Sequence, residues 1–495
     1  MKKIFGIIKK SITFVKLLII KNMSLIKSIS GIRGTIGGSP NNNLTPLDIV
    51  KFTSAFGIFI KNNHKNEKGL KIVVARDARI SGQIVENIVV STLLSLGFDV
   101  INIGLATTPT SEIAVIIEKA SGGIIITASH NPKQWNALKL LNENGEFISA
   151  EDGKIVLELA EKENFSYSDI ENLGREIKIK NYEDIHIQKI LALKLVDIDG
   201  IKNSNFSVAI DCINSVGAIA VPKLLKALGV NNIIELNNEV NGLFAHNPEP
   251  LPENLTEISE LTKNNNVDVA FVVDPDVDRL AIICEDGSMF GEEYTLVACA
   301  DYVLSKKIGN AVSNLSSSRA LQDICENYNV EYNSAAVGEV NVVEKMKLTN
   351  AIIGGEGNGG IILPEIHYGR DALVGIALFL SLMAKKKQKI SELKTTYPQY
   401  FISKNKIELN ENINIIEIFN KIKNKYKNQQ ITDIDGIKIT FNETKEWVHL
   451  RKSNTEAIIR IYSESKTIET ANNLAQKIII DLKNFIMETS INPKI

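Results

Sequence analysis

One short segment combines residue types that could transfer a chemical group. It reads Thr127-Ala128-Ser129-His130-Asn131-Pro132 and follows the apolar run at 123–126. That run is short and β-branched without a helical period, which is typical of a buried strand. Asn-Pro then favours a turn, so a serine hydroxyl would lie at the tip of a rigid strand, where α/β proteins carry reactive loops. The pattern indicates that Ser129 carries a transferable group; the alternative is a strand-to-helix turn whose polar residues only cap backbone groups.

Three aspartates at alternate positions form the strongest local signal in the chain. Asp274, Asp276 and Asp278 lie in DPDVDR, directly after the strand expected at 267–273. Carboxylates this close repel one another unless a cation lies between them. Oxygen ligands favour Mg²⁺ or Mn²⁺ over zinc, and Arg279 stands where a calcium-binding EF-hand loop needs glycine. The pattern predicts a divalent metal site; the alternative is an acidic turn that Arg279 neutralises.

Two basic residues could join the serine. Arg33 lies between glycines in SGIRGT, where its guanidinium could contact a phosphate bidentately. Lys139 lies ten residues after Ser129 and could return to the same site as a general acid or base. Taken alone, the Arg33 segment is weak evidence, because Gly-x-Arg-Gly is common in turns. For Lys139 taken alone, a solvated surface lysine is the favoured interpretation.

Two later loops are suited to a sugar phosphate. GEGNGG at 355–360 offers a carboxylate and an amide to sugar hydroxyls, although its glycines could serve turn geometry only. RKSNTEA at 451–457, with Arg460 beyond it, combines arginine, hydroxyl and amide groups. Such a set suits a phosphate, and the alternative is a polar hairpin tip.

The surrounding pattern predicts the scaffold of these loops. Strands are expected at 71–75, 99–103, 207–211, 267–273 and 310–315, and helices at 44–62 and 218–228. Strand and helix alternating at this spacing predict α/β layers with mostly parallel sheets. The tail from about 400 differs, because its strands alternate with two helices expected at 415–427 and 467–485.

Length, composition and charge indicate a globular protein of several domains. At 495 residues, two to four domains are expected. The chain is 44% hydrophobic and 23% charged, and its net charge of -2 gives no reason to expect nucleic acid or an anionic membrane as partner. Its four cysteines show no CxxC spacing, which fits reduced thiols in the cytoplasm.

The first 22 residues stand apart because they mix lysines with short apolar runs. No run is long enough to span a bilayer, and lysines interrupt the centre that a signal peptide would need. A basic amphipathic helix on a membrane is one interpretation. The simpler one, which we favour, is a dispensable extension preceding a true start at Met23.

With these loops in hand, the chain resembles the α-D-phosphohexomutase superfamily, and within it the phosphoglucosamine mutases. Four motifs stand in family order: TASHNP at the phosphoserine loop, DPDVDR at the metal loop DGDGDR, GEGNGG at the sugar loop GEMSGH or GEQSGH, and RKSNTEA at the phosphate loop RxSGTEP. The resemblance covers nearly everything from Met23 to the end.

The resemblance implies an α/β fold with three similar mixed-sheet domains and a C-terminal α+β (TBP-like) domain around a central cleft. The expected boundaries are 1–22 for the extension, then 23–175 for the phosphoserine, 182–290 for the metal, 291–397 for the sugar and 400–495 for the phosphate.

The resemblance also implies roles. The catalytic residues are expected to be Ser129, Lys139, Arg33 and His130. One Mg²⁺ per chain is expected on Ser129, Asp274, Asp276 and Asp278. The residues expected to bind substrate are Arg279, Gly338, Glu356, Asn358, Arg451, Ser453, Asn454, Thr455 and Arg460. Ser129 would cycle through phosphoserine with a hexose bisphosphate as primer.

Departures from the family pattern concern the sugar and phosphate loops. Asn358 replaces the usual serine and Gly360 the usual histidine, which leaves open what assists proton transfer. Asn454 and Ala457 replace glycine and proline in the phosphate loop, where asparagine tolerates positive φ.

The implied activity is reversible conversion of glucosamine 6-phosphate to glucosamine 1-phosphate, a precursor of UDP-N-acetylglucosamine. The alternatives are a phosphomannomutase/phosphoglucomutase, or a non-catalytic sugar-phosphate-binding protein on the same fold. The expected partner is a small hexose phosphate, with no nucleic acid and no transmembrane segment, and the chain is expected to be a monomer or homodimer.

Overall fold

The fold is described from a computed structural model, which covers residues 24–28, 31–65, 67–409, 413–453 and 458–491. The predicted extension at 1–22 lies outside these residues. The chain forms two compact units. The first consists of Met1–Leu193, Ser207–Ile258 and Val272–Asp278, and the second of Lys194–Phe206, Ser259–Phe271 and Arg279–Ile495.

A seven-stranded mixed sheet is the centre of the first unit, with the strand order β1-β2-β6-β5-β3-β4-β7. Its strands are β1 (Ile26–Ser28), β2 (Gly31–Thr35), β3 (Lys71–Arg76), β4 (Asp99–Leu105), β5 (Gly122–Ile126), β6 (Trp135–Leu141) and β7 (Glu176–Lys178). β3 runs parallel to β4 and β5, but β6 runs antiparallel to both β5 and β2. The sheet is therefore mixed, as the family resemblance implies. It departs from the mostly parallel order expected from strand-helix alternation at β6, because the connection 127–134 is too short for a parallel crossover.

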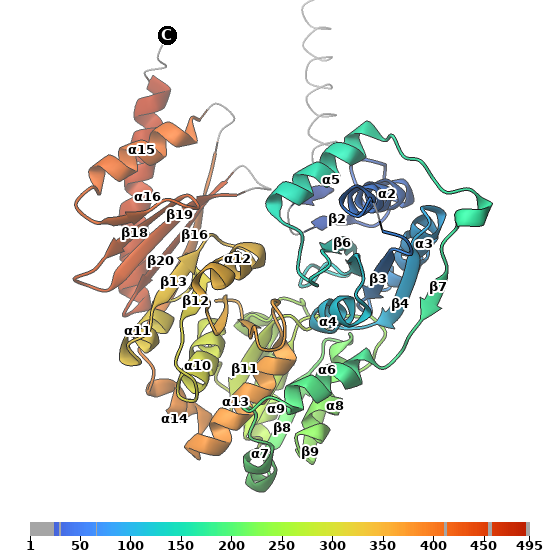
Figure 1. The fold of residues 1–495 in the computed structure, drawn as a ribbon. Coiled ribbons are helices and arrows are strands. Elements are labelled where there is room, and N and C mark those ends of the chain that lie inside the picture. The colour runs from blue at the N-terminus through green and yellow to red at the C-terminus, as the bar shows by residue number, and fades with distance from the viewer. Residues whose placement is uncertain (1–23, 29–30, 66, 410–412, 454–457, 492–495) are drawn as a thin grey trace, which may run out of the picture. The chain divides into compact units, whose positions relative to one another are not determined.

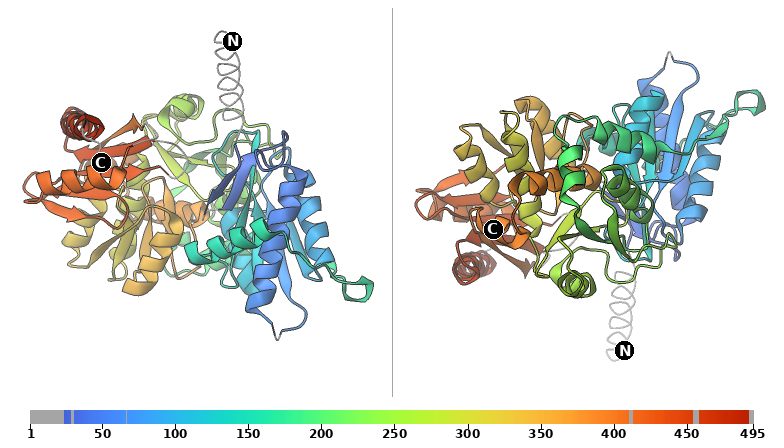
Figure 2. Two further views of the ribbon diagram at one scale, coloured as in Figure 1. Left: turned by 90° about the horizontal axis from the view of Figure 1, so that it is seen from above. Right: turned by 90° about the horizontal axis from the view of Figure 1, so that it is seen from below.

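Helices cover both faces of this sheet, as Figures 1 and 2 show. Successive residues of β3 point to opposite faces: Ile72 and Val74 pack into one core cluster, Val73 and Ala75 into another. The first cluster includes residues of α2 (Pro46–Asn63), α3 (Gly82–Ser95) and α5 (Ala150–Lys162), and the second residues of α4 (Thr108–Glu118) and α6 (Tyr182–Leu191). The result is a three-layer α/β/α domain.

The next sheet has the order β11-β10-β8-β9. Its strands are β8 (Ser207–Asp211), β9 (Asn232–Leu236), β10 (Val269–Val273) and β11 (Leu280–Cys284), and the connecting helices are α8 (Gly217–Ala227) and α9 (Thr256–Asn264). β8 is parallel to β9, as strand-helix-strand connections require. β8 and β10 are buried along their whole length, so each carries its following loop on a rigid base.

The third sheet lies in the second unit and has the order β13-β12-β14-β15. It consists of β12 (Ala311–Asn314), β13 (Tyr332–Ala335), β14 (Ile353–Glu356) and β15 (Gly360–Ile362), and its unit contains α7 (Ile198–Ser204), α10 (Glu292–Leu304), α11 (Ala320–Asn327), α12 (Glu339–Thr349), α13 (Ala372–Lys386) and α14 (Ile390–Thr395). α13 is buried from Ala372 to Ala384, as expected of a helix that is apolar all round.

The C-terminal sheet is wholly antiparallel, with the order β16-β20-β19-β18-β17. Its elements are β16 (Phe401–Glu408), α15 (Ile415–Lys425), β17 (Gln430–Thr432), β18 (Ile437–Phe441), β19 (Glu446–Lys452), β20 (Ile458–Ser465) and α16 (Ile468–Ile491). Side chains from both helices share one core cluster with the strands. The predicted fold class, three α/β domains followed by a separate sheet domain, is confirmed.

The four cysteines are buried free thiols. Within the described ranges, we find no helix that combines the length and the apolar character needed to cross a bilayer.

Candidate active site

The serine loop has an unusual backbone conformation. Ser129 has φ of +48°, in the left-handed region that a residue with a Cβ seldom adopts. Its N–H donates to Thr127 Oγ1 at 2.9 Å, and the Thr127 hydroxyl donates to Asp77 Oδ2 at 2.7 Å. Such strain is retained where the surroundings enforce it, and it is common at functional sites.

A fully buried arginine enforces the shape of this loop. The Arg79 guanidinium donates to the backbone carbonyls of Ser129, Asn131 at 2.8 Å, Pro132 at 2.9 Å and Trp135 at 3.0 Å. Its Nε donates to Asp77 Oδ2 at 2.9 Å. Burial raises the pKa of the Asp77 carboxyl, and the Arg79 charge opposes this effect. Sequence reasoning missed Arg79, although the polar run after β3 was a signal.

The serine hydroxyl meets the aspartate loop directly. Ser129 Oγ donates to Asp274 Oδ2 at 2.7 Å, although 145 positions separate the two residues in sequence. The loop after β10 is a tight turn, because the Asp278 N–H donates back to Asp274 Oδ1 at 3.1 Å and Val277 has φ of +63°. The two predicted loops are therefore brought together.

The three aspartates form a candidate metal site. Asp274, Asp276 and Asp278 are fully buried, and one carboxylate oxygen of each lies within 4.8 Å of the others. Asp276 Oδ1 is buried with no hydrogen-bond partner in the described part of the chain. Three buried carboxylates with an unsatisfied oxygen are costly without a cation. Oxygen donors alone suit Mg²⁺, so the residues fit the predicted ion.

Lys139 returns to the site as predicted. It lies on β6 opposite Ile125 of β5, and its Nζ is 2.7 Å from Asp276 Oδ2 and 3.4 Å from Asp278 Oδ2. A lysine between two carboxylates offsets part of their negative charge. The hydroxyl of Thr108, which sequence reasoning missed, also donates to Asp276 Oδ2 at 2.6 Å.

His130 and Arg33 lie close to the same loop. His130 Nδ1 is 3.4 Å from Ser129 Oγ. Arg33 on β2 is paired with Ala137 on β6. Since residues two apart in a strand share a face, Arg33 and Lys139 belong to one face of the sheet.

The predicted sugar loop in the second unit is organised around Glu356. Its Oε1 accepts hydrogen bonds from Asn314 Nδ2 at 2.9 Å and from the Gly338 N–H at 3.0 Å. Its Oε2 accepts from Arg370 Nη1 at 2.8 Å. Asn358 Oδ1 accepts from the Gly360 N–H at 3.3 Å, so this side chain also braces its own loop. Glu356 and Gly338 are thus brought together, whereas Asn314 and Arg370 were missed.

The predicted phosphate loop begins from two opposed arginines. Arg451 on β19 and Arg460 on β20 are direct cross-strand partners. Like charges in such positions repel each other, which suits an anion site, and Asp435 Oδ2 lies 2.9 Å from Arg451 Nε. Ser453 is buried, and Asn454 and Thr455 lie outside the described residues. Arg279 precedes β11 in the second unit.

His449 on β19 lies just before this loop in the sequence and is held by two hydrogen bonds. His449 Nε2 lies 2.6 Å from the Asp435 carbonyl, which can only accept, so Nε2 carries the proton. The Ser316 hydroxyl then donates to His449 Nδ1 at 2.8 Å. Burial lowers the pKa of His449 to about 4, so the ring is neutral near pH 7.

Comparison with known proteins identifies the family. Models of phosphoglucomutase/phosphomannomutase alpha/beta/alpha domains I, II and III match residues 25–167, 184–287 and 291–400. A phosphoglucosamine/phosphogalactosamine mutase of Sulfurisphaera tokodaii is 34% identical, over 92% of this chain and 98% of its own length. A phosphoglucomutase/phosphomannomutase of Thermococcus kodakarensis is 36% identical, over 88% of this chain and 95% of its own length.

A solved structure supports the fold independently. The crystal structure of a phosphoglucomutase/phosphomannomutase family protein from Burkholderia thailandensis matches with a TM-score of 0.80 at 22% identity, over 93% of this chain and 98% of that one. Matching domain models and nearly full-length relatives together confirm the resemblance seen in the motifs. The chain belongs to the phosphoglucomutase/phosphomannomutase family of the α-D-phosphohexomutase superfamily.

Proposed function

We propose that this phosphohexomutase interconverts glucosamine 6-phosphate and glucosamine 1-phosphate through a phosphorylated Ser129. The observation that carries the proposal is the 2.7 Å hydrogen bond from Ser129 Oγ to Asp274, beside two further buried aspartates. A protein that only binds sugar phosphates would need neither the strained serine nor the three carboxylates.

The proposed reaction is two successive phosphoryl transfers. In the first, the bond from Ser129 Oγ to phosphorus breaks while the free hydroxyl of the sugar monophosphate bonds to phosphorus and loses its proton. The resulting hexose bisphosphate turns around and returns its other phosphate to Ser129 Oγ. The serine is phosphorylated again at the end, and the net change is the position of the phosphate on the sugar.

The residues around Ser129 would stabilise the charge that develops. Bound Mg²⁺, held by Asp274, Asp276 and Asp278, would neutralise charge on the transferring phosphoryl group. Lys139, whose Nζ lies 2.7 Å from Asp276, is our candidate for moving the proton. Arg33 would supply further positive charge to the phosphate, and His130 would help electrostatically.

The second unit carries the residues proposed to recognise the substrate. Glu356, Asn358 and Gly338 would contact sugar hydroxyls. The phosphate that is not reacting would be held by Arg451, Ser453, Asn454, Thr455 and Arg460, with Arg279 as a further contact. The direct pairing of Arg451 with Arg460 supports an anion there.

The choice of an amino sugar rests on the GEGNGG loop and on two relatives, one named phosphoglucosamine/phosphogalactosamine mutase and the other probable phosphoglucosamine mutase. Its product would feed UDP-N-acetylglucosamine synthesis in the cytoplasm. The alternative is a phosphomannomutase/phosphoglucomutase, which the 36% identical relative from Thermococcus kodakarensis supports.

The test is mutase turnover with Mg²⁺ and glucose 1,6-bisphosphate as primer, comparing the 6-phosphates of glucosamine, mannose and glucose. Preference for the amino sugar would support the proposal, and preference for mannose or glucose 6-phosphate would favour the alternative. Ser129→Ala should abolish turnover and the phosphate mass found on the wild-type protein. Full turnover by this variant would refute the phosphoserine mechanism.

A further inference from the structure

In the sugar loop, the Arg370 side chain fills the space where a side chain at position 360 would lie. A Cβ atom at Gly360 would lie 2.3 Å from Arg370 Cδ and 3.0 Å from its Cγ. The backbone of Gly360 does not have the positive φ that requires glycine. The position is therefore restricted by the arginine side chain, and any larger residue at 360 would have to displace it.

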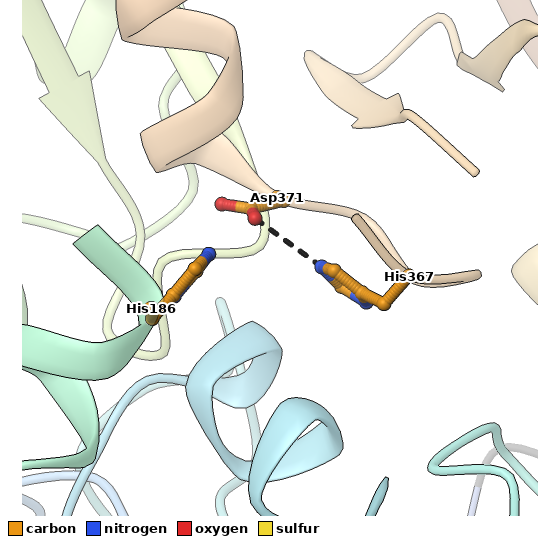
Figure 3. A group of neighbouring side chains, drawn as sticks. All are labelled: His186, His367 and Asp371. Carbon is orange, nitrogen blue, oxygen red and sulfur yellow. Dashed lines mark hydrogen bonds and ion pairs between the residues drawn. The ribbon is translucent and has the colours of Figure 1, made fainter. Parts of the chain in front are cut away.

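Arg370 is held firmly in this position. Its N–H donates to Glu339 Oε1 at 2.9 Å, and its Nε lies 3.1 Å from Glu339 Oε2. The next residue, Asp371, caps α13 by accepting from the Leu373 N–H at 2.9 Å. Asp371 Oδ2 also lies 3.2 Å from His367 Nε2 (Figure 3). The guanidinium therefore reaches the loop from a fixed backbone and loses little freedom when it binds Glu356.

The guanidinium fixes one oxygen of Glu356. Arg370 Nη1 donates to Oε2 at 2.8 Å, whereas Asn314 and the Gly338 N–H hold Oε1. Glu356 and Arg370 are only 5% and 8% exposed, so these contacts are largely shielded from water. A carboxylate held at both oxygens has a fixed plane, and its remaining lone pairs point in fixed directions.

We propose that Arg370 is the positioning residue of the sugar site: it orients Glu356 toward the hydroxyls of a hexose phosphate and fills the space that a side chain at 360 would otherwise occupy. The inference rests on the proposed function and deepens it. It also gives Gly360 a physical role, since glycine at the position usually held by histidine leaves room for the arginine.

The first experiment compares Arg370→Gln, Arg370→Lys and the exposed control Arg175→Gln in the mutase assay. We expect Arg370→Gln to raise KM for the preferred hexose 6-phosphate about tenfold to a hundredfold, the effect of losing one charge-assisted hydrogen bond. kcat should change less, because sugar binding is shared by ground and transition states. Arg370→Lys should recover part of the affinity, and Arg175→Gln should match the wild type. A folded Arg370→Gln protein with wild-type KM would overturn the proposal.

A double-mutant cycle separates positioning from a general loss of structure. If Arg370 acts through Glu356, the KM of Arg370→Gln/Glu356→Gln should equal that of Glu356→Gln alone. If the KM increases of the two single variants instead multiplied in the double variant, the proposal would be overturned.

Gly360→Ala keeps the arginine but pushes it aside, so it tests the proposal even if Arg370→Gln does not fold. We expect its KM to rise like that of Arg370→Gln, with an unchanged circular dichroism spectrum. Wild-type KM in Gly360→Ala would overturn the shared-space argument.

A binding measurement separates this inference from the proposed function. Calorimetry of each variant with glucose 1-phosphate does not depend on turnover. If the wild type turns over no hexose phosphate, the proposed function fails. Weaker glucose 1-phosphate binding by Arg370→Gln would then still support the positioning role, and unchanged binding would overturn it.

Discussion

The two carboxylate oxygens of Asp276 have different surroundings. Oδ2 accepts from Thr108 and Lys139, whereas Oδ1 is buried without a hydrogen-bond partner among the described residues. Asparagine could keep the accepting oxygen and remove one of three neighbouring negative charges. We therefore expect Asp276→Asn to stabilise the metal-free protein by about 1 kcal/mol.

Thermal unfolding with EDTA and with Mg²⁺ checks this prediction. The Tm of the variant should rise in EDTA, and its increase on adding Mg²⁺ should shrink. Asp199→Asn, which changes an exposed carboxylate, is the matched control. A lower Tm in EDTA together with an undiminished Mg²⁺ response would contradict a metal site at these aspartates.

Candidate site residues that lie in contiguous motifs could be found from the sequence. Ser129 and the aspartates follow strands within a few positions, so their types and spacing carried the signal. Arg79 and Thr108 bind partners 52 and 168 positions away, and Arg370 binds one 14 positions away. No local pattern states which carbonyl or carboxylate each of them meets. From the sequence, Gly360 was recognised only as a departure from the family motif. Its structural role depends on the Arg370 side chain that packs against it.

The conformation of the whole loop after β5 depends on Arg79. The guanidinium bonds to its carbonyls from Ser129 to Trp135, and the Phe244 ring lies 5.0 Å away. Lysine would keep the charge beside Asp77 but could not reach these carbonyls together. We expect Arg79→Lys to lower the free energy of unfolding by about 3 kcal/mol.

Urea unfolding and phosphoserine content by intact mass check this expectation. Turnover should fall about tenfold or more, because the serine loop loses its bracing. Arg175→Lys, at an exposed position, serves as the control. Wild-type stability and turnover in Arg79→Lys would show that the loop keeps its shape without the guanidinium.

The buried His449 on β19 should make the folding stability of the protein fall in acid. The folded pKa of about 4 lies below the unfolded value of 6.5, so the unfolded chain binds more protons between these values. Stability present above pH 6.5 is therefore lost as pH falls toward 4, by at most about 3 kcal/mol.

Comparing the wild type with His449→Gln isolates this contribution from that of the carboxylates. We expect the variant to be less stable at pH 7 but to lose less stability between pH 6.5 and 4.5, measured by denaturant unfolding at each pH. Parallel curves for the two proteins would mean that His449 is not held neutral in the folded state.

Strand and helix positions were largely predictable, whereas pairing was not. The expected strand at 207–211 coincides with β8, and the helix expected at 44–62 is α2. Apolar periodicity is local and therefore visible in the sequence. The antiparallel return of β6 depends on how the 127–134 connection closes, which the general expectation of parallel α/β order overlooked.

At the scale of the whole molecule, three α/β domains follow one another along the chain, but the compact units do not follow this order. The first unit combines Met1–Leu193 with Ser207–Ile258 and Val272–Asp278. Repeated strand-helix patterns predicted the domains because each pattern is continuous in sequence. The grouping depends on long-range contacts such as that of Ser129 with Asp274, which no local pattern contains.

Residues 1–22 precede every part of the chain that the family models match. The first family model begins at residue 25, and the Sulfurisphaera relative is aligned over 98% of its length by 92% of this chain. The domains matched by the family models and the proposed site residues therefore all lie beyond this segment. We expect a chain starting at Met23 to keep the Tm, solubility and mutase turnover of the full chain, measured side by side. A loss of turnover or solubility would assign the basic, apolar segment a role of its own, and vesicle co-sedimentation of both chains would then test whether that role is membrane association.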